Sequence, residues 1–192
     1  MPGSSLWLLP PESHPLNHPL PTLIEQTSAR FGSPNRFIPH VTLTSEISPS
    51  LYGNNPQEWL DSLDLSEGSG AKVKFERLAS EDVYVRKLYI KCTKMKELDA
   101  LAAICRRQVE GHDERKANSW ATESYNPHLS LLYHDCPPID AEGLAATAES
   151  VEKAGLSLVG EGKLGGWVGG RIILVPTDRP IVEWVSIAER CL

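Results

Sequence analysis

The sequence lacks the features of a membrane-spanning, secreted or long-nucleic-acid-binding protein. No apolar run approaches the roughly 18 residues of a membrane span, and the early run Leu6 to Leu9 ends at Pro10 and Pro11. The N-terminus has no basic region typical of a signal peptide. With 19 Lys and Arg against 25 Asp and Glu, the formal net charge of −6 disfavours a partner held along many phosphates. We therefore expect an intracellular, most simply cytoplasmic, protein that binds no long nucleic acid.

Cysteine is scarce as well. The four cysteines, at positions 92, 105, 136 and 191, form no C-x-x-C pair and no spacing typical of a zinc site. We expect reduced thiols, with a bridge between Cys92 and Cys105 as the alternative. The remaining composition is that of an ordinary folded protein, with 41% hydrophobic and 23% charged residues. A chain of 192 residues then makes one compact unit or two small lobes.

Hydrophobic periodicity predicts strands and helices in alternation. Strands are expected over Ser4–Leu9 and over residues 36–44, 71–78, 82–93 and 125–133, with 71–78 and 82–93 paired as an antiparallel hairpin. Helices are expected over residues 20–31, 95–109 and 139–153, with one or two turns around 59–63. We also expect a polar loop over 111–123, a hairpin of 156–163 with 167–175, and a closing helix over 181–188. Locally paired strands with helices between them indicate an α+β fold.

A short internal repeat stands out from this background. Residues 39–43, Pro-His-Val-Thr-Leu, recur as residues 127–131, Pro-His-Leu-Ser-Leu. An aromatic residue, Phe37 or Tyr125, lies three positions before the histidine in each copy. Because side chains alternate faces along a strand, His40 and Thr42 point to one face, and so do His128 and Ser130. Two similar lobes facing each other would place both pairs across one cleft.

Two imidazoles and two hydroxyls suit phosphodiester hydrolysis without a metal. One histidine can take a proton from the attacking water while the other protonates the departing ribose oxygen. The hydroxyls of Thr42 and Ser130 can donate to the phosphoryl oxygens. A metal site is the alternative for two histidines, but neither motif contains Asp, Glu or Cys. We expect no metal and no cofactor, and which histidine is the base stays open.

On these residues the chain resembles the two-histidine (2H) phosphoesterases, and within them the cyclic nucleotide phosphodiesterases of fungi and plants. The resemblance covers nearly the whole chain and is carried by residues 5–7, 36–42, 125–133 and 172–184. It implies a bilobal, LigT-like fold of two antiparallel sheets with pseudo-twofold symmetry around a central cleft. Residues 1–192 would form one such domain, and each lobe would contribute one H-x-[ST] strand.

The resemblance also implies an activity. Members hydrolyse ADP-ribose 1″,2″-cyclic phosphate to ADP-ribose 1″-phosphate, downstream of tRNA splicing, and open nucleoside 2′,3′-cyclic phosphates to 2′-phosphates. It implies His40 and His128 as the acid/base pair, Thr42 and Ser130 as phosphate donors, a small nucleotide substrate and no metal. We expect a monomer. Golgi association, as suggested for fungal relatives, is the alternative to the cytoplasm.

Three aromatic residues are weaker candidates. Tyr133 matches a position near the phosphate in relatives, although strict alternation from His128 would place it on the opposite face unless a bulge or the strand's end re-aims it. Trp7 matches an aromatic near the site in relatives and could stack on a base, and Trp167, between two glycine pairs, is a comparable candidate. Two other functions stay open: an RNA-end phosphodiesterase acting on RNA 2′,3′-cyclic phosphate, and a nucleotide-binding module without catalysis.

Overall fold

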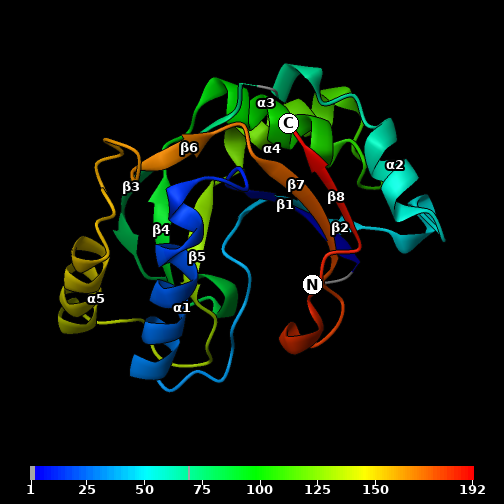
Figure 1. The fold of residues 1–192 in the computed structure, drawn as a ribbon. Helices are drawn as coiled ribbons and strands as arrows, with labels where there is room; N and C mark the ends of the chain where they lie inside the picture. The colour runs from blue at the N-terminus through cyan, green and yellow to red at the C-terminus, as the bar shows by residue number, and fades with distance from the viewer. Residues whose placement is uncertain (1–2, 69) are drawn as a thin grey trace.

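One curved antiparallel sheet forms the centre of the molecule. The computed structural model describes residues 3–68 and 70–192, and its 8-stranded sheet has the order β6-β3-β4-β5-β2-β1-β7-β8. The sheet bends into an open arch (Figure 1). The strands are β1 (Ser4–Leu9), β2 (Val41–Ile47), β3 (Lys72–Ala79), β4 (Leu88–Cys92), β5 (His128–Leu132), β6 (Gly166–Val168), β7 (Arg171–Pro176) and β8 (Ala188–Cys191).

The sheet consists of two halves that meet at the repeated motif. β2 and β5 are neighbours through a single residue pair, Val41 with Leu129, whereas the other neighbouring strands share longer registers. One half therefore runs from β6 to β5 and the other from β2 to β8. The predicted α+β class is confirmed, but the two expected antiparallel sheets are here two halves of one continuous sheet, which meet at the motif strands.

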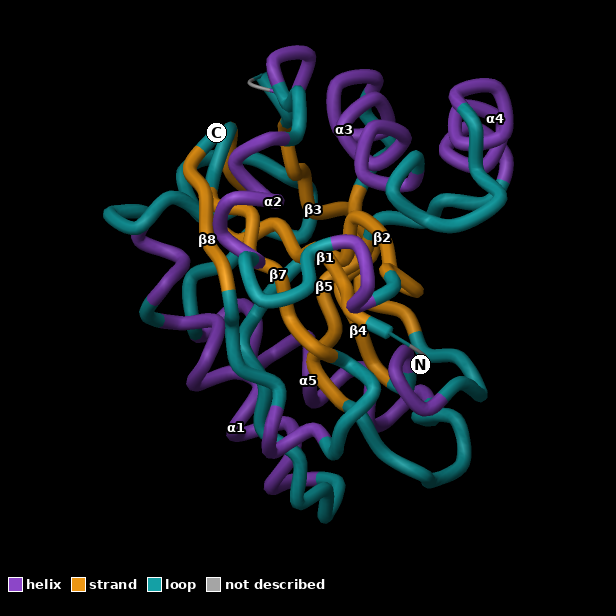
Figure 2. The backbone as a smooth tube through the Cα atoms, turned by 90° about the vertical axis from the view of Figure 1, so that its right-hand side faces the viewer, coloured by secondary structure: helices purple, strands orange, loops and turns teal. Residues whose placement is uncertain are grey.

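The helices cover the side of the sheet opposite the motif side chains. They are α1 (Pro19–Arg30), α2 (Pro56–Ser62), α3 (Lys96–Arg106), α4 (Glu114–Glu123) and α5 (Ala141–Lys153). Leu20, Leu23 and Ile24 of α1 join one apolar core with Leu98 and Leu101 of α3. α3 and α4 lie above the arch, and α1 and α5 lie beside it (Figures 1 and 2).

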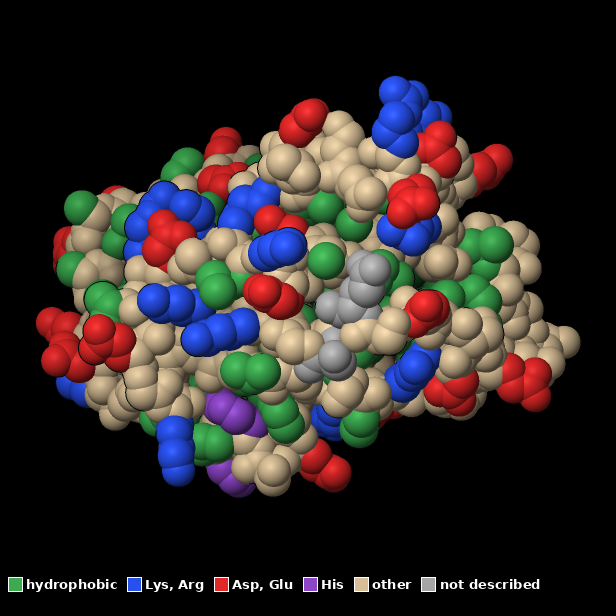
Figure 3. All heavy atoms as spheres, turned by 90° about the horizontal axis from the view of Figure 1, so that it is seen from above, with side chains coloured by type: hydrophobic (Ala, Val, Ile, Leu, Met, Phe, Trp, Pro, Cys, Tyr) green, Lys and Arg blue, Asp and Glu red, His purple; other side chains and the backbone are tan. Residues whose placement is uncertain are grey.

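The molecule seen from above carries no continuous field of one charge. Lys and Arg side chains alternate with Asp and Glu over this face (Figure 3). Within residues 3–68 and 70–192, no helix is both long enough and apolar enough to cross a bilayer. Cys92, Cys105, Cys136 and Cys191 are all free thiols, so the Cys92–Cys105 bridge is not formed.

The predicted hairpin of 156–163 with 167–175 is wrong. The chain from 156 to 165 makes turns, β6 pairs with β3, and β7 pairs with β1. Gly166 and Gly170 make this route possible, since their φ angles of 145° and 125° are ones that side chains disfavour. A Cβ at these positions would also clash with the carbonyls of Val73 and Leu9. The glycines therefore carry the chain from one half of the sheet to the other.

The polar loop predicted over 111–123 is also wrong, because it contains α4. Asp113 caps the helix by accepting a hydrogen bond from the backbone N–H of Lys116 at 2.8 Å. The helix buries only Ala117 and Ala121. Two small residues on one face give too weak an apolar period for recognition in the sequence, and packing against α3 supplies the rest.

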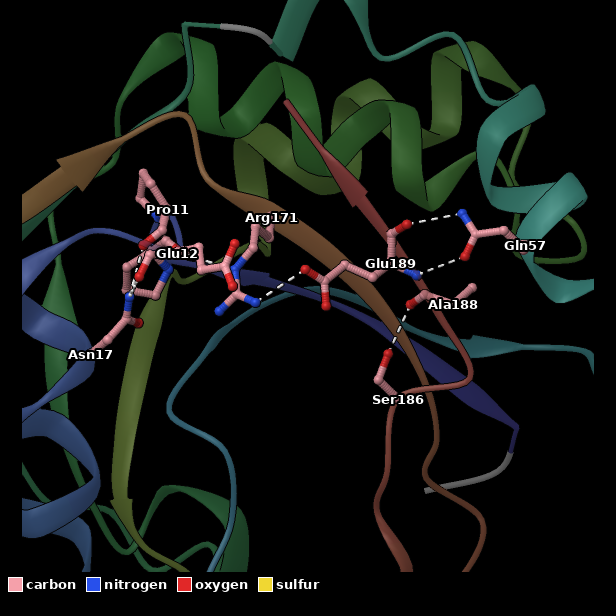
Figure 4. A network of polar contacts seen from close by, with 9 residues as sticks. Pro11, Glu12, Asn17, Gln57, Arg171, Ser186, Ala188 and Glu189 are labelled. Atoms are coloured by element: carbon pink, nitrogen blue, oxygen red, sulfur yellow. Dashed lines mark hydrogen bonds and ion pairs between the residues drawn. The ribbon is translucent and has the colours of Figure 1, made fainter.

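The closing helix predicted over 181–188 is replaced by a 3₁₀ turn, Ile181–Glu183, and the edge strand β8. Its apolar spacing does not mark a buried face, since Val185, one of the spaced residues, is 60% exposed. α2 fixes the edge strand: Gln57 exchanges hydrogen bonds with the backbone of Glu189 at 2.9 and 3.1 Å (Figure 4). In the opposite direction, the Arg190 side chain of β8 donates to the carbonyls of residues 60, 61 and 63, at the end of α2, at 3.2, 3.1 and 2.7 Å.

The other predicted elements are present with shifted ends. Strand 36–44 begins only at Val41, and strand 82–93 begins at Leu88 after a loop that includes the 3₁₀ turn Tyr84–Arg86. Strand 125–133 shortens to His128–Leu132. The first strand matches its predicted bounds. His40 therefore lies directly before its strand and His128 is the first residue of its strand, so each is next to a loop that can shape its surroundings.

Candidate active site

The pairing of β2 with β5 brings the two motifs side by side in opposite directions. Val41 faces Leu129 in this antiparallel register, and both side chains are fully buried in the core. Extending the register by one residue sets His40 opposite Ser130 and Thr42 opposite His128. All four then share the face away from Val41 and Leu129, as the alternation predicts. Diagonal neighbours of this kind lie about 7–8 Å apart, which is the separation expected for the two histidines.

His40 is held rigidly and almost without water. The residue is 4% exposed, and its ring stacks on Trp7, with ring centroids 3.6 Å apart and planes 6° from parallel. Nδ1 lies 2.6 Å from the carbonyl oxygen of Ile38, and because a carbonyl only accepts, Nδ1 carries the proton. Nε2 therefore keeps the free lone pair. Burial lowers the pKa of His40 to about 3, against the opposing effect of the Ile38 carbonyl, and the charge of His128 lowers it further.

His128 is oriented in the same way from the other half of the sheet. Its Nδ1 lies 2.8 Å from the carbonyl oxygen of Asn126, so its Nε2 is also the free nitrogen. The ring packs edge to face on Tyr89, with centroids 5.3 Å apart. Burial lowers the pKa of His128, opposed by the Asn126 carbonyl and supported by the charge of Arg86. Both histidines thus have the same tautomer, fixed by the carbonyl two residues earlier.

The two hydroxyl residues differ in their surroundings. Ser130 is buried, and its hydroxyl donates to the carbonyl oxygen of Val85 at 2.8 Å. Thr42 is half-buried and, with His128, lines a cavity of about 190 Å³. The backbone carbonyl of Thr42 accepts a hydrogen bond from the Tyr125 hydroxyl at 3.2 Å. The aromatic residue before the second motif thus ties the two motif strands together.

Tyr133 reaches the first histidine although its offset from His128 is odd. β5 ends at Leu132, and the chain turns there, so that the Tyr133 hydroxyl lies 3.4 Å from Nε2 of His40. The phenol ring stacks on Phe37 at 3.8 Å between centroids. Burial raises the pKa of Tyr133. The phenol therefore stays protonated and able to donate, and its role toward a phosphate stays a prediction.

The structure treats the two predicted stacking tryptophans differently. Trp7 lies at the site, but it is 1% exposed and its partner is the imidazole of His40. Trp167 is 3% exposed and packs edge to face on Phe75 in the core. Its strand, β6, is separated from β5 by β3 and β4. Neither indole presents a free ring face on which a base could stack.

Two residues that the sequence did not single out adjoin the histidines. Trp184 contacts Trp7 and Tyr133 edge to face, at 5.8 and 5.9 Å between centroids. Arg86 lines both cavities that His128 lines. Neither belongs to the repeat, and only the three-dimensional arrangement of the 80–87 loop and the C-terminal segment reveals them.

Two larger cavities flank the histidines and differ in character. On the His40 side, a cavity of about 670 Å³ is lined mainly by apolar and aromatic residues, among them Phe37, Ile38 and Trp184. On the His128 side, a cavity of about 340 Å³ is lined by Arg77, Arg86 and Lys91, among others. Two imidazoles whose Nε2 atoms carry no proton can move protons to and from one bound group. No set of three or more His, Cys, Asp or Glu side chains with metal-site geometry occurs among the described residues.

The chain is similar to several known proteins. A family model described as "Cyclic phosphodiesterase-like protein" matches residues 1–192. A 2′,3′-cyclic-nucleotide 3′-phosphodiesterase of Phaeosphaeria nodorum is 64% identical over 191 residues, covering 99% of each chain. One of Neurospora crassa is 41% identical over 213 residues, covering 100% of each. Among solved structures, E. coli LigT complexed with 3′-AMP matches with a TM-score of 0.48 and 14% identity, over 100% of this chain and 99% of that one.

Proposed function

Because the chain belongs to the cyclic phosphodiesterase-like family, we propose that it hydrolyses nucleoside 2′,3′-cyclic phosphates to nucleoside 2′-phosphates. The observation that carries the proposal is the pairing of β2 with β5, which sets His40 and His128 on one face beside Thr42 and Ser130. The names of the similar fungal proteins describe the same reaction.

The reaction needs one base and one acid on opposite sides of phosphorus. One imidazole Nε2 takes a proton as water oxygen bonds to phosphorus, and the other gives a proton to the ribose 3′ oxygen as its bond to phosphorus breaks. A lowered pKa makes the neutral, base form available in His40 and in His128. A bound phosphate anion raises the pKa of the imidazole that it touches, so the substrate itself favours the acid form.

Hydroxyl groups complete the site. Charge builds up on the two non-bridging phosphoryl oxygens as the fifth bond to phosphorus forms, and donors aimed at these oxygens lower the barrier. Thr42, Ser130 and Tyr133 are the donors that we assign to this role. The Ser130 hydroxyl must leave the Val85 carbonyl, 2.8 Å away, to donate to the substrate.

We further propose that the enzyme works without a metal, acts as a monomer and also hydrolyses ADP-ribose 1″,2″-cyclic phosphate, in the metabolism of tRNA-splicing products. The 1″,2″-cyclic phosphate is a five-membered cyclic diester of a ribose, as the 2′,3′-cyclic phosphate is, so the same acid and base serve both. General acid and base catalysis each contribute roughly 10²- to 10⁴-fold in rate.

The test is ³¹P NMR of the protein in EDTA with adenosine 2′,3′-cyclic phosphate and with ADP-ribose 1″,2″-cyclic phosphate. We expect the 2′-phosphate and the 1″-phosphate as products, and a loss of at least about 10²-fold in His40→Ala and in His128→Ala. His112→Ala is the matched control, because His112 makes a similar Nδ1 contact with the Glu110 carbonyl, at 3.3 Å, away from the site.

Three results would count against the proposal. Turnover that appears only after a divalent ion is added would contradict metal independence. Full activity in either histidine variant would contradict the acid/base pair. Tight binding without turnover would indicate a binding module, and hydrolysis of oligonucleotide 2′,3′-cyclic phosphates in strong preference to mononucleotides would indicate an RNA-end enzyme.

A further inference from the structure

A row of cations on the sheet beside His128 takes no part in the mechanism above. In the registers of the second half, His128 faces Lys91 on β4, and Lys91 faces Arg77 on β3. Residues paired in this way point to the same face of a sheet. Because neighbouring strands lie about 4.8 Å apart, Lys91 and Arg77 follow His128 at steps of about 5 and 10 Å.

Arg86 joins this row from the loop before β4. Its guanidinium lies 2.8 Å from the Glu81 carboxylate and lines the cavity of about 340 Å³ together with Arg77, Lys91 and His128. Arg86 also lines the cavity of about 190 Å³ that Thr42 and His128 share. Arg86 therefore connects the candidate phosphate site with Lys91 and Arg77. We call these three residues, Arg77, Arg86 and Lys91, the cationic row.

The cationic row keeps donors for a ligand. Lys91 and Arg77 share one carboxylate, that of Glu76, at 3.0 and 3.7 Å, and Arg86 pairs with Glu81. Three cations against two carboxylates leave one positive charge in excess, in a chain whose net charge is −6. A guanidinium has five N–H donors and an ammonium three, and each of these cations has one carboxylate partner within the described residues.

The cavity on the His40 side has two cations, Arg36 and Arg171, against three on the His128 side. Its Arg171 donates to the Glu189 carboxylate at 3.0 Å (Figure 4). The same guanidinium donates to the Pro10 carbonyl at 3.3 Å. Its Arg36 donates to the carbonyls of Ser33 and Asn35 at 3.0 and 2.9 Å. This cavity offers mainly apolar and aromatic walls, so an anionic part of a substrate is favoured on the His128 side.

We propose that the cationic row binds a second phosphate group of the substrate. The enzyme would then prefer ribose cyclic phosphates that carry a further phosphate, such as a 5′-phosphate or a diphosphate, over the unphosphorylated nucleoside cyclic phosphate. This inference rests on the proposed function, since the cyclic phosphate must lie between His40 and His128 for the second phosphate to reach the row.

The experiment compares kcat/KM for adenosine 2′,3′-cyclic phosphate with that for its 5′-phosphorylated form. We expect the wild type to prefer the phosphorylated substrate by at least about tenfold, because charge-assisted hydrogen bonds to phosphate are strong. Added salt should reduce this preference, since the Debye length is about 10 Å at 0.1 M. The double variant Arg77→Gln, Lys91→Gln should lose the preference and keep its rate on the unphosphorylated substrate.

Arg171→Gln is the matched control and should keep the wild-type preference. Equal rates on both substrates in the wild type, or an undiminished preference in the double variant, would overturn the inference while leaving the proposed function intact. A preference lost in Arg171→Gln instead would move the second phosphate to the His40 side and overturn it as well. Hydrolysis of neither substrate would overturn the proposed function, and the inference with it.

Discussion

Acid should destabilise this protein through His40 in particular. Burial lowers the pKa of His40 from 6.5 to about 3 in the folded state, whereas an unfolded chain leaves the imidazole at its ordinary value. The unfolded state therefore binds a proton first as the pH falls below 6.5. Stability is complete above that pH and declines as the pH falls toward 3, because protons favour the unfolded chain.

The size of this effect follows from the two pKa values. A difference of one pKa unit corresponds to about 1.4 kcal/mol, so the full span amounts to about 5 kcal/mol. Between pH 7.5 and pH 5.0 about 2 kcal/mol of it is lost, because at pH 5.0 the unfolded imidazole is almost fully protonated and the folded one is not. Such a loss is large against a typical stability of about 5–15 kcal/mol.

The comparison that isolates His40 is with His40→Asn. The Asn amide can still donate to the Ile38 carbonyl but does not titrate, and the loss of stacking on Trp7 affects both pH values equally. We expect urea unfolding, followed by tryptophan fluorescence, to show that the wild type loses about 2 kcal/mol more than the variant between pH 7.5 and 5.0.

Groups distant from His40 titrate alike in both proteins, so they cancel in this double difference; His128, whose charge lowers the pKa of His40, is the exception. His18→Asn, a change at an exposed histidine, should leave the wild-type difference in place. An equal loss in the wild type and in His40→Asn would refute the reasoning. It would mean that His40 is accessible to water and not held neutral by burial against Trp7.

Three other changes test separate parts of the structure. Tyr133→Phe removes only the hydroxyl that lies 3.4 Å from His40 Nε2. We expect kcat to fall about tenfold and the circular dichroism spectrum to stay unchanged. An unchanged kcat would exclude a phosphate-donor role for Tyr133. Arg190→Ala removes three hydrogen bonds to backbone carbonyls at the end of α2. We expect the free energy of unfolding in urea to fall by about 2 kcal/mol, with no change in kcat per folded molecule. Arg190→Lys should recover part of this loss. Gly170→Ala should lower the free energy of unfolding by more than about 2 kcal/mol, because the backbone would be strained and the new Cβ would clash with the Leu9 carbonyl. Gly162→Ala should cost less, because Gly162 has a φ of 67° but open space around it. Equal losses would show that the contact between residue 170 and the Leu9 carbonyl does not matter.

The sequence alone determined which side chains of the repeat share a face. Alternation along a strand is a local property of the backbone, so Val41 and Leu129 enter the core while the histidines and hydroxyls point the other way. The first strand and the helices α1, α3 and α5 were predicted for a similar reason, since each has a strong apolar period. The family resemblance also rested on short sequence segments, chiefly the two repeated motifs.

The tertiary structure decided what lies beside these residues. The register that sets His40 opposite Ser130 joins segments 88 residues apart (128 − 40), and no local period encodes it. α4 and β8 form because α3 and β7 offer them partners, which overrides weak or misleading periodicity. Burial of His40 under Trp7, and the row that Lys91 and Arg77 form beside His128, likewise depend on which strands become neighbours. The sequence therefore specifies the reacting groups, whereas the pairing of distant strands determines their pKa values and the charges around them.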